Sequence, residues 1–277
     1  SSGPSPGPAP AGAHPVTIDA TALAYHGFII PGVTPAFIDS RRRQLLQLTP
    51  GRYGFQFASG YYASFTFTVT EAGTVDYAAE HESFLSGRGT HTLALDGLTV
   101  TIDARQVSGA GVLLANMPMT TADWIDRRQL RLLPARHYTV QQSSGELANL
   151  SFALGADGRF SYDPSLDVDA GGVLSGRGSP TLQFIGHRVC LDARSAGGSG
   201  VSVHPVWGMP FSRTGLQYVA LLPQRRLALR LEPGSDSPLR FAVAANGTIS
   251  HDPSLAPYLH TSRVGGHQVL TATGRPG

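Results

Sequence analysis

Three aspartates at similar intervals are the residues whose spacing first suggests chemistry. Asp19, Asp103 and Asp192 lie in two copies of VTIDA and one of VCLDA, which begin at residues 16, 100 and 189. Three equivalent carboxylates that meet near a three-fold axis could hold a hard cation through oxygen ligands. In the alternative, each aspartate ends a strand, where it caps a turn or pairs with an arginine two residues on, such as Arg105 or Arg194.

The longest identity between copies is a Leu-Ser-Gly-Arg-Gly segment at residues 85–89 and 174–178. Glycines beside Arg88 and Arg177 would let the backbone approach an anion while the guanidinium forks onto it. The alternative is a bend that leads into a strand, with the arginine paired to a carboxylate. The last part of the chain lacks this segment, so a site built on it would exist twice.

An apolar, irregular stretch follows each aspartate segment, at residues 28–37, 112–124 and 201–211. The aromatic residues of these stretches offer flat faces for stacking, and their methionines offer adaptable contacts. We therefore take four aromatic residues as candidate ligand contacts: Phe37, Trp124, Trp207 and Phe211. The alternative is that the three stretches fill the core.

Metal and cofactor signals are weak. Asp163, Asp167 and Asp169 have the spacing of a calcium loop, but the segment lacks the sharp-turn glycine and the terminal glutamate of an EF-hand. The ten histidines form no HxH or HExxH pattern. We expect no cofactor, with calcium at these aspartates as the alternative.

Catalytic templates are missing as well. The chain has no G-x-S-x-G elbow, no P-loop and no G-x-G-x-x-G, and Cys190 falls inside an expected strand. An enzyme would have to use residues that differ between the copies, such as His26, Glu80, His81, Glu82, His204 and Trp207. A hydrolase, or an isomerase or cyclase, with an asymmetric acid/base site therefore stays as the rival to a binding protein.

The strands and hairpins that must position these residues can be predicted from the repeated sequence segments. Other landmarks keep register with the aspartates, which predicts three tandem copies of about 85 residues at 16–98, 100–187 and 189–277. Each copy contains an Ala-Gly, Asp-Gly or Asn-Gly pair, at Gly73, Gly158 and Gly247, between alternating apolar residues, which predicts a hairpin. We expect five to seven short strands per copy and an all-β fold, because no segment has helical periodicity.

A second hairpin is predicted between successive copies, through Asp96-Gly97 and through Ile185-Gly186. The first strand would then lack a partner unless the C-terminal end supplies it. We therefore expect the copies to close into one pseudo-three-fold antiparallel β-barrel or propeller-like body, with three small β-units in a row as the alternative.

Composition bounds the function. The 277 residues are 41% hydrophobic and 14% charged, and all 21 basic residues are arginine. We expect a folded, monomeric protein that binds no nucleic acid, because the only basic run is residues 41–43. The single cysteine forbids an internal disulfide.

Residues 1–14 are predicted to form a flexible Pro/Gly leader, which is typical of exported proteins, and residues 15–277 one repeat-built β domain. No stretch is apolar for long enough to cross a bilayer. The sequence thus favours a secreted or extracytoplasmic, non-enzymatic protein that holds a glycan, an apolar small molecule or a surface through its aromatic loops.

Overall fold

The protein is built from β-strands joined by turns and short 3-10 helices. The computed structural model describes residues 7–23, 27–33, 37–39, 42–115, 124–142, 147–197, 200–206, 208–232 and 239–274. Aspartate caps begin three of the 3-10 helices, and η1 (Ala79–Ser83), which lacks such a cap, is the longest 3-10 helix among the described residues, with five residues. The predicted all-β fold is confirmed.

Three four-stranded sheets share one strand order. In each, the strand that ends at the repeated aspartate runs antiparallel to the next long strand and parallel to a strand about 75 to 80 residues later. The sheets are β4 (Arg43–Leu48), β1 (His14–Asp19), β9 (Thr92–Leu95), β8 (Leu85–Ser86); β12 (Arg127–Leu132), β10 (Leu98–Asp103), β17 (Thr181–Phe184), β16 (Leu174–Ser175); and β20 (Leu216–Leu221), β18 (His187–Asp192), β25 (His267–Ala272), β24 (Leu259–Val264).

A second layer of strands accompanies each of these sheets. The first two groups join through the pairing of Ala63 with Ala135 into one nine-stranded sheet, whereas the third is a separate four-stranded sheet. The nine strands are β2 (Gly27–Ile29), β3 (Phe37–Asp39), β5 (Gly51–Phe57), β6 (Tyr62–Val69), β7 (Val75–Asp76), β11 (Val112–Leu114), β13 (Ala135–Gln142), β14 (Leu147–Leu154) and β15 (Phe160–Ser161). The four are β19 (Gly200–His204), β21 (Gln224–Glu232), β22 (Arg240–Val243) and β23 (Ile249–Ser250).

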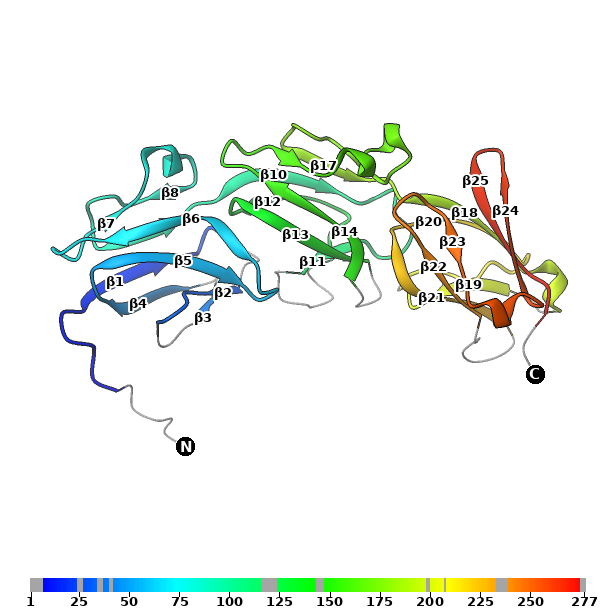
Figure 1. The fold of residues 1–277 in the computed structure, drawn as a ribbon, viewed down its shortest axis with the longest axis horizontal. Helices are drawn as coiled ribbons and strands as arrows, with labels where there is room; N and C mark the ends of the chain where they lie inside the picture. The colour runs from blue at the N-terminus through cyan, green and yellow to red at the C-terminus, as the bar shows by residue number, and fades with distance from the viewer. Residues whose placement is uncertain are drawn as a thin grey trace.

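We call residues 14–95, 98–184 and 187–272 the first, second and third unit. Figure 1 shows them side by side in a row, with the two ends of the chain at opposite ends of the row. The hairpins predicted at Gly73, Gly158 and Gly247 are confirmed by the pairing of β6 with β7, β14 with β15 and β22 with β23.

The predicted closure is wrong, since the described strands form no closed barrel. The hairpin expected between copies does not form, because β9 pairs with β1 and β17 pairs with β10, each within its own unit. The turn at Asp96-Gly97 instead folds back on its own unit, where both backbone N–H groups donate to the Phe84 carbonyl. The first strand is therefore already paired, and the units extend as a row.

Alternating side chains bury one face of most long strands in a core between the two layers, whereas β24 is buried only at Leu259. The core is aromatic in the first unit, where Phe55 lies 5.4 Å from Phe67 and 5.6 Å from Phe65 between ring centroids. The third unit has a separate cluster of mostly aliphatic residues. This packing supplies the main stabilisation, because apolar area removed from water contributes about 25 cal/mol per Å².

Neighbouring units meet through equivalent backbone contacts. The Ser64 N–H donates to the Pro134 carbonyl at 3.0 Å, and the Asn149 N–H donates to the Pro223 carbonyl at 2.7 Å. Leu133 and Leu222, which precede these prolines, are completely buried. The proline turns thus fix how one unit sits against the next.

Candidate functional site

The repeated aspartates do not converge. They lie in three different sheets, and each is bound by groups close to it in its own unit. Asp103 receives both a backbone and a side-chain hydrogen bond from Arg105, and Asp192 receives the same pair from Arg194. The three carboxylates therefore form no shared cation site, and their contacts match the interpretation of turn capping and local arginine pairing.

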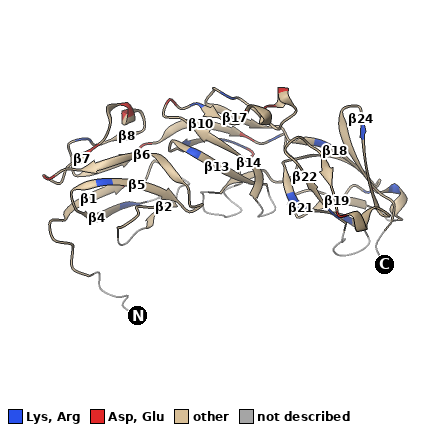
Figure 2. Cartoon of the chain, in the orientation of Figure 1, with Lys and Arg blue, Asp and Glu red and all other residues tan. Residues whose placement is uncertain are grey.

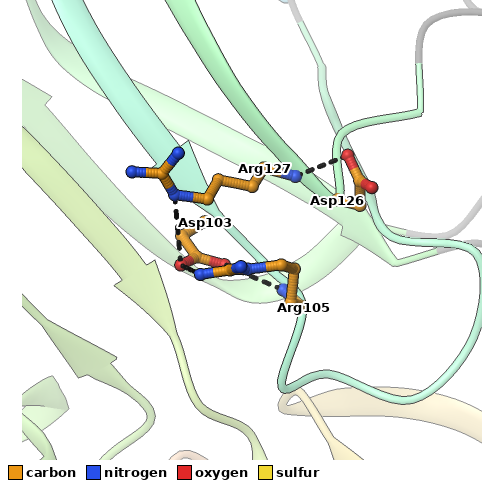
Figure 3. A network of polar contacts seen from close by, with 4 residues as sticks. All are labelled: Asp103, Arg105, Asp126 and Arg127. Carbon is orange, nitrogen blue, oxygen red and sulfur yellow. Dashed lines mark hydrogen bonds and ion pairs between the residues drawn. The ribbon is translucent and has the colours of Figure 1, made fainter.

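Figure 3 shows how completely Asp103 is engaged. Besides the fork from Arg105, the Arg127 Nε lies 3.8 Å from its carboxylate, and the Arg127 backbone N–H donates to Asp126. The side-chain hydrogen bond from Arg105 lowers the pKa of Asp103 against the opposing effect of burial. This carboxylate stays charged and serves the fold.

Both Ser-Gly-Arg-Gly segments form tight bends, with Gly87 and Gly176 at φ +100°. Arg88 forms ion pairs with Asp76 at 3.6 Å and with Glu82 at 3.2 Å, and its guanidinium lies 4.7 Å from the Tyr77 ring centroid. Those contacts match the alternative of a bend with a paired arginine.

Arg177 donates its backbone N–H to the Tyr162 hydroxyl. With Arg159 it lines a shallow pocket of about 530 Å³. The Arg159 guanidinium donates to the Gly178 carbonyl across this pocket at 2.7 Å. The pocket thus holds two arginines, one of them already bonded to the backbone of the bend.

Two of the three candidate calcium ligands are engaged in caps. The Asp163 carboxylate accepts from the Ser165 N–H, and the Asp167 carboxylate accepts from the Asp169 N–H and from the Tyr162 hydroxyl. Among the described residues, no three His, Cys, Asp or Glu side chains gather closely enough to hold a metal ion. The structure does not bring the aspartates of this segment together as ligands.

Three of the four candidate aromatics occupy one equivalent position. Phe37, Trp124 and Phe211 each precede a residue that bridges to β2, β11 or β19. Trp207 lies outside the described residues. Phe37 is 56% exposed, and Trp124 and Phe211 are half-buried. The expected equivalence of the three irregular stretches therefore extends to the pairing of their strands.

The three rings differ in what covers them. The Phe37 ring packs over Gly27, and the Phe211 ring packs over Gly200. The Arg230 guanidinium lies 5.3 Å from the Phe211 ring centroid. Phe211 is thus already covered by its own unit, whereas Phe37 keeps more than half of its surface open.

A row of side chains crosses the outer face of the nine-stranded sheet from Phe37. Register places Phe37 opposite Ile29, Ile29 opposite Gln56, and Gln56 opposite Tyr62. Directly opposed residues share one face of a sheet. Three strand spacings of about 4.8 Å place Phe37 and Tyr62, both more than half exposed, about 14 Å apart.

The corresponding row in the second unit is largely covered, since Leu113 is 3% and Gln141 9% exposed. Leu113 pairs with Gln141, which pairs with the exposed Leu147. The Gln141 side chain is nine-tenths buried, and its Oε1 has no hydrogen-bond partner among the described residues. Gln141 takes the place that Gln56 has in the first unit, so both rows carry an amide between apolar side chains.

A stacked pair joins the two rows. The rings of Tyr61 and His137 lie 3.7 Å apart between centroids, at an interplanar angle of 25°. Burial lowers the pKa of His137, which favours the uncharged ring. Beside it lies a shallow pocket of about 350 Å³ lined by polar groups, among them Asn149, Ser151 and Asp163.

We call this outer face, defined by Phe37, Gln56, Tyr61, Tyr62, His137 and Leu147, the aromatic platform. Sequence reasoning found only Phe37 of this set. The adjacent Tyr61 and Tyr62 after Gly60 were the available signal, because two consecutive aromatics cannot both enter the core from one strand.

The residues proposed for an enzyme do not assemble. His26 and Trp207 lie outside the described residues. His81 packs against Phe84, Glu82 pairs with Arg88, and Glu80 and His204 are exposed. Within the described part of the chain, no histidine forms an ion pair with a carboxylate.

Comparison of the chain with protein-family models, with curated proteins and with solved structures finds no match. Along the described stretches, no helix is long and apolar enough to cross a bilayer.

Proposed function

We propose that the protein is a non-enzymatic binding protein whose aromatic platform holds a neutral glycan chain. The observation that carries this proposal is the row from Phe37 to Tyr62, with two exposed rings at its ends and the Gln56 amide between them. Sugar rings present apolar faces that stack on aromatic side chains and hydroxyls that bond to amides. The flat, extended face suits a polymer better than a small apolar molecule, which would need a deep pocket.

The repeated architecture supports the same proposal. In this proposal three copies of one unit of about 85 residues, derived by tandem triplication, lie in the row of Figure 1, and the platform offers contacts from two of them, Phe37 and Tyr62 in the first unit and Leu147 in the second. Contacts in tandem raise the overall affinity without new chemistry at each unit. The single chain acts as a monomer, and the Pro/Gly leader suits a secreted or extracytoplasmic location where such polymers are met.

The test is sedimentation of the full chain with insoluble cellulose, chitin and xylan. We expect retention on at least one of them, with Phe37→Ala and Tyr62→Ala each weakening it about tenfold, which corresponds to about 1.4 kcal/mol. Leu45→Ala is the control, because Leu45 is 65% exposed on β4 of a different sheet. Equal retention of all four proteins, or retention on none of the polymers, would overturn the proposal.

The rival enzyme hypothesis keeps its own test. Release of soluble sugars from the same polymers, lost in a Glu82→Gln variant, would favour a hydrolase over a binding protein. The ion pair of Glu82 with Arg88 argues against that outcome.

A further inference from the structure

The two junctions between units are built alike but differ in one side chain. At the first junction, Arg131 pairs with Thr99 and donates from Nη1 to the Asp96 carbonyl at 3.3 Å. At the second, the equivalent pair is Arg188 with Ala220. The long side chain that lies over the first turn is therefore absent at the second.

A pocket of about 310 Å³ lies at the second junction. Its lining includes Gln106 and Ser108 from the second unit, Gly186 from the connecting turn, and Arg188 and Ala220 from the third unit. Ser108 is fixed there, because its N–H donates to the Ala220 carbonyl and its Oγ accepts from the Ala220 N–H at 2.8 Å. The pocket thus has rigid walls from two units.

The Arg188 side chain is held against an aromatic ring, and no ion pair among the described residues neutralises its charge. Its guanidinium lies 4.8 Å from the ring centroid of Tyr218, and the His267 ring meets the same tyrosine edge-on at 5.7 Å. No carboxylate in the described part of the chain forms an ion pair with Arg188. A guanidinium stacked on a ring keeps the N–H groups of its edge free to fork onto a carboxylate.

The surrounding charge favours an anion. Residues 187–277 contain nine arginines and four acidic residues, whereas residues 1–186 contain twelve and fifteen. Figure 2 shows basic residues on β18, β21 and β24 of the third unit, and acidic ones around β7 and β8 of the first. Tyr218 and Arg188 stand where the second unit has the uncharged Gln129 and Thr99, so these features are particular to the third unit.

We propose that this junction pocket binds the carboxylate-bearing ring of a uronic acid, either free or as a residue of an acidic polysaccharide. Arg188 holds the carboxylate, and the Ser108 hydroxyl and the Gln106 amide bond to ring hydroxyls. Ala220 and Val219 supply the apolar floor, and the volume admits about one sugar ring. The site is independent of the aromatic platform.

The test is calorimetric titration of the full chain at low ionic strength with D-galacturonate, D-galactose and sulfate. Galacturonate should bind at least tenfold more tightly than galactose, which differs from it only at C6, where a hydroxymethyl group replaces the carboxylate. It should also bind at least tenfold more tightly than sulfate, which carries charge without a sugar ring. Equal affinities for galacturonate and galactose, or for galacturonate and sulfate, would overturn the proposal.

Variants taken from the second unit locate the site. Arg188→Thr removes the carboxylate partner, and Ala220→Arg refills the pocket as Arg131 does at the first junction. Each should weaken galacturonate binding at least tenfold. Arg52→Thr in the first unit also removes one positive charge and should leave binding unchanged. If Ala220→Arg lowers the melting temperature, Arg188→Thr alone decides, and wild-type affinity in that variant would refute the assignment.

Two further experiments distinguish a free uronic acid from a residue of a polymer, and binding at the junction pocket from binding at the aromatic platform. Retardation of the chain in a gel containing polygalacturonate, lost in Arg188→Thr, identifies a polymer residue, whereas binding of galacturonate alone identifies the free acid. Phe37→Ala should keep full galacturonate affinity. Loss of galacturonate binding in Phe37→Ala would show that the ligand sits on the platform and not at the junction.

Discussion

Arg105 donates two parallel hydrogen bonds to the Asp103 carboxylate, from Nε to Oδ1 at 3.0 Å and from Nη2 to Oδ2 at 2.8 Å. Arg194 donates the same two hydrogen bonds to Asp192, from Nε to Oδ1 at 3.0 Å and from Nη2 to Oδ2 at 2.9 Å. Such forks are stronger than single neutral hydrogen bonds and fix the direction of the chain where it leaves the strand. The repeated carboxylates therefore define the end of a structural element in each unit.

Acid should weaken the fold through these carboxylates. The side-chain hydrogen bonds from Arg105 and Arg194 lower the pKa values of Asp103 and Asp192 below the ordinary value of 3.8. Their contribution is then complete above about pH 4 and is lost as the pH falls through the lowered values. We expect the free energy of unfolding to drop between pH 5 and pH 2, and to drop less in an Asp103→Asn/Asp192→Asn double variant.

Urea denaturation across this pH range measures the effect. At pH 7 each single substitution should cost about 1 kcal/mol, because the arginines are largely exposed and screened by solvent. Glu71→Gln is the control, since Glu71 is exposed. Parallel pH profiles of the double variant and the wild type would contradict the role of the two forks.

The amide of Gln142 couples the second unit to the third. It is completely buried; its Nε2 donates to the Ser108 carbonyl, and its Oε1 accepts from the Leu222 N–H and from the Gln224 side chain. Gln142→Met keeps the volume but leaves these buried groups unpaired, so it should cost about 1–3 kcal/mol. Urea denaturation measures the loss, with Gln47→Met on the exposed face of β4 as the control.

Hydrogen exchange adds a local readout for Gln142→Met. The Leu222 amide should exchange faster in the variant, while amides of the first unit keep their protection. Unchanged protection at Leu222 would mean that another group supplies the contact between the units.

The two glycines of the Ser-Gly-Arg-Gly bend should differ in how much stability is lost when each is replaced by alanine. A Cβ at Gly87, which has φ +100°, would lie 2.0 Å from the Thr92 carbonyl oxygen, whereas a Cβ at Gly89, with φ +78°, would meet nothing within 4 Å. We expect Gly87→Ala to destabilise by about 3 kcal/mol and Gly89→Ala by about 1 kcal/mol. Thermal unfolding compares the two, and equal losses would show that steric contact does not explain the shared sequence.

Cys190 should behave as a packed side chain. It is 5% exposed and stands where the other units have Thr17 and Thr101. Cys190→Thr should change the free energy of unfolding by less than about 1 kcal/mol. The thiol should react with Ellman's reagent only after denaturant is added, and rapid labelling of the folded protein would refute this placement.

The sequence by itself determined the local structure. Alternation around Gly73, Gly158 and Gly247 predicted three hairpins that form as expected, because a turn and its flanking strands are encoded by neighbouring residues. The three irregular stretches that begin at Phe28, Val112 and Val201 were likewise recognisable as equivalent, and Phe37, Trp124 and Phe211 occupy one equivalent position in them.

Only the tertiary structure decided which distant strands pair and what each face presents. A parallel partner about 75 residues away leaves no local signature, so β9 could not be assigned to β1 in place of β10 from the sequence. The platform and the junction pocket depend on the same long-range register, which brings Tyr62 into line with Phe37 and sets Ala220 over the turn at Gly186. The pairing of distant strands thus arranges the three units in a row instead of the expected closed body.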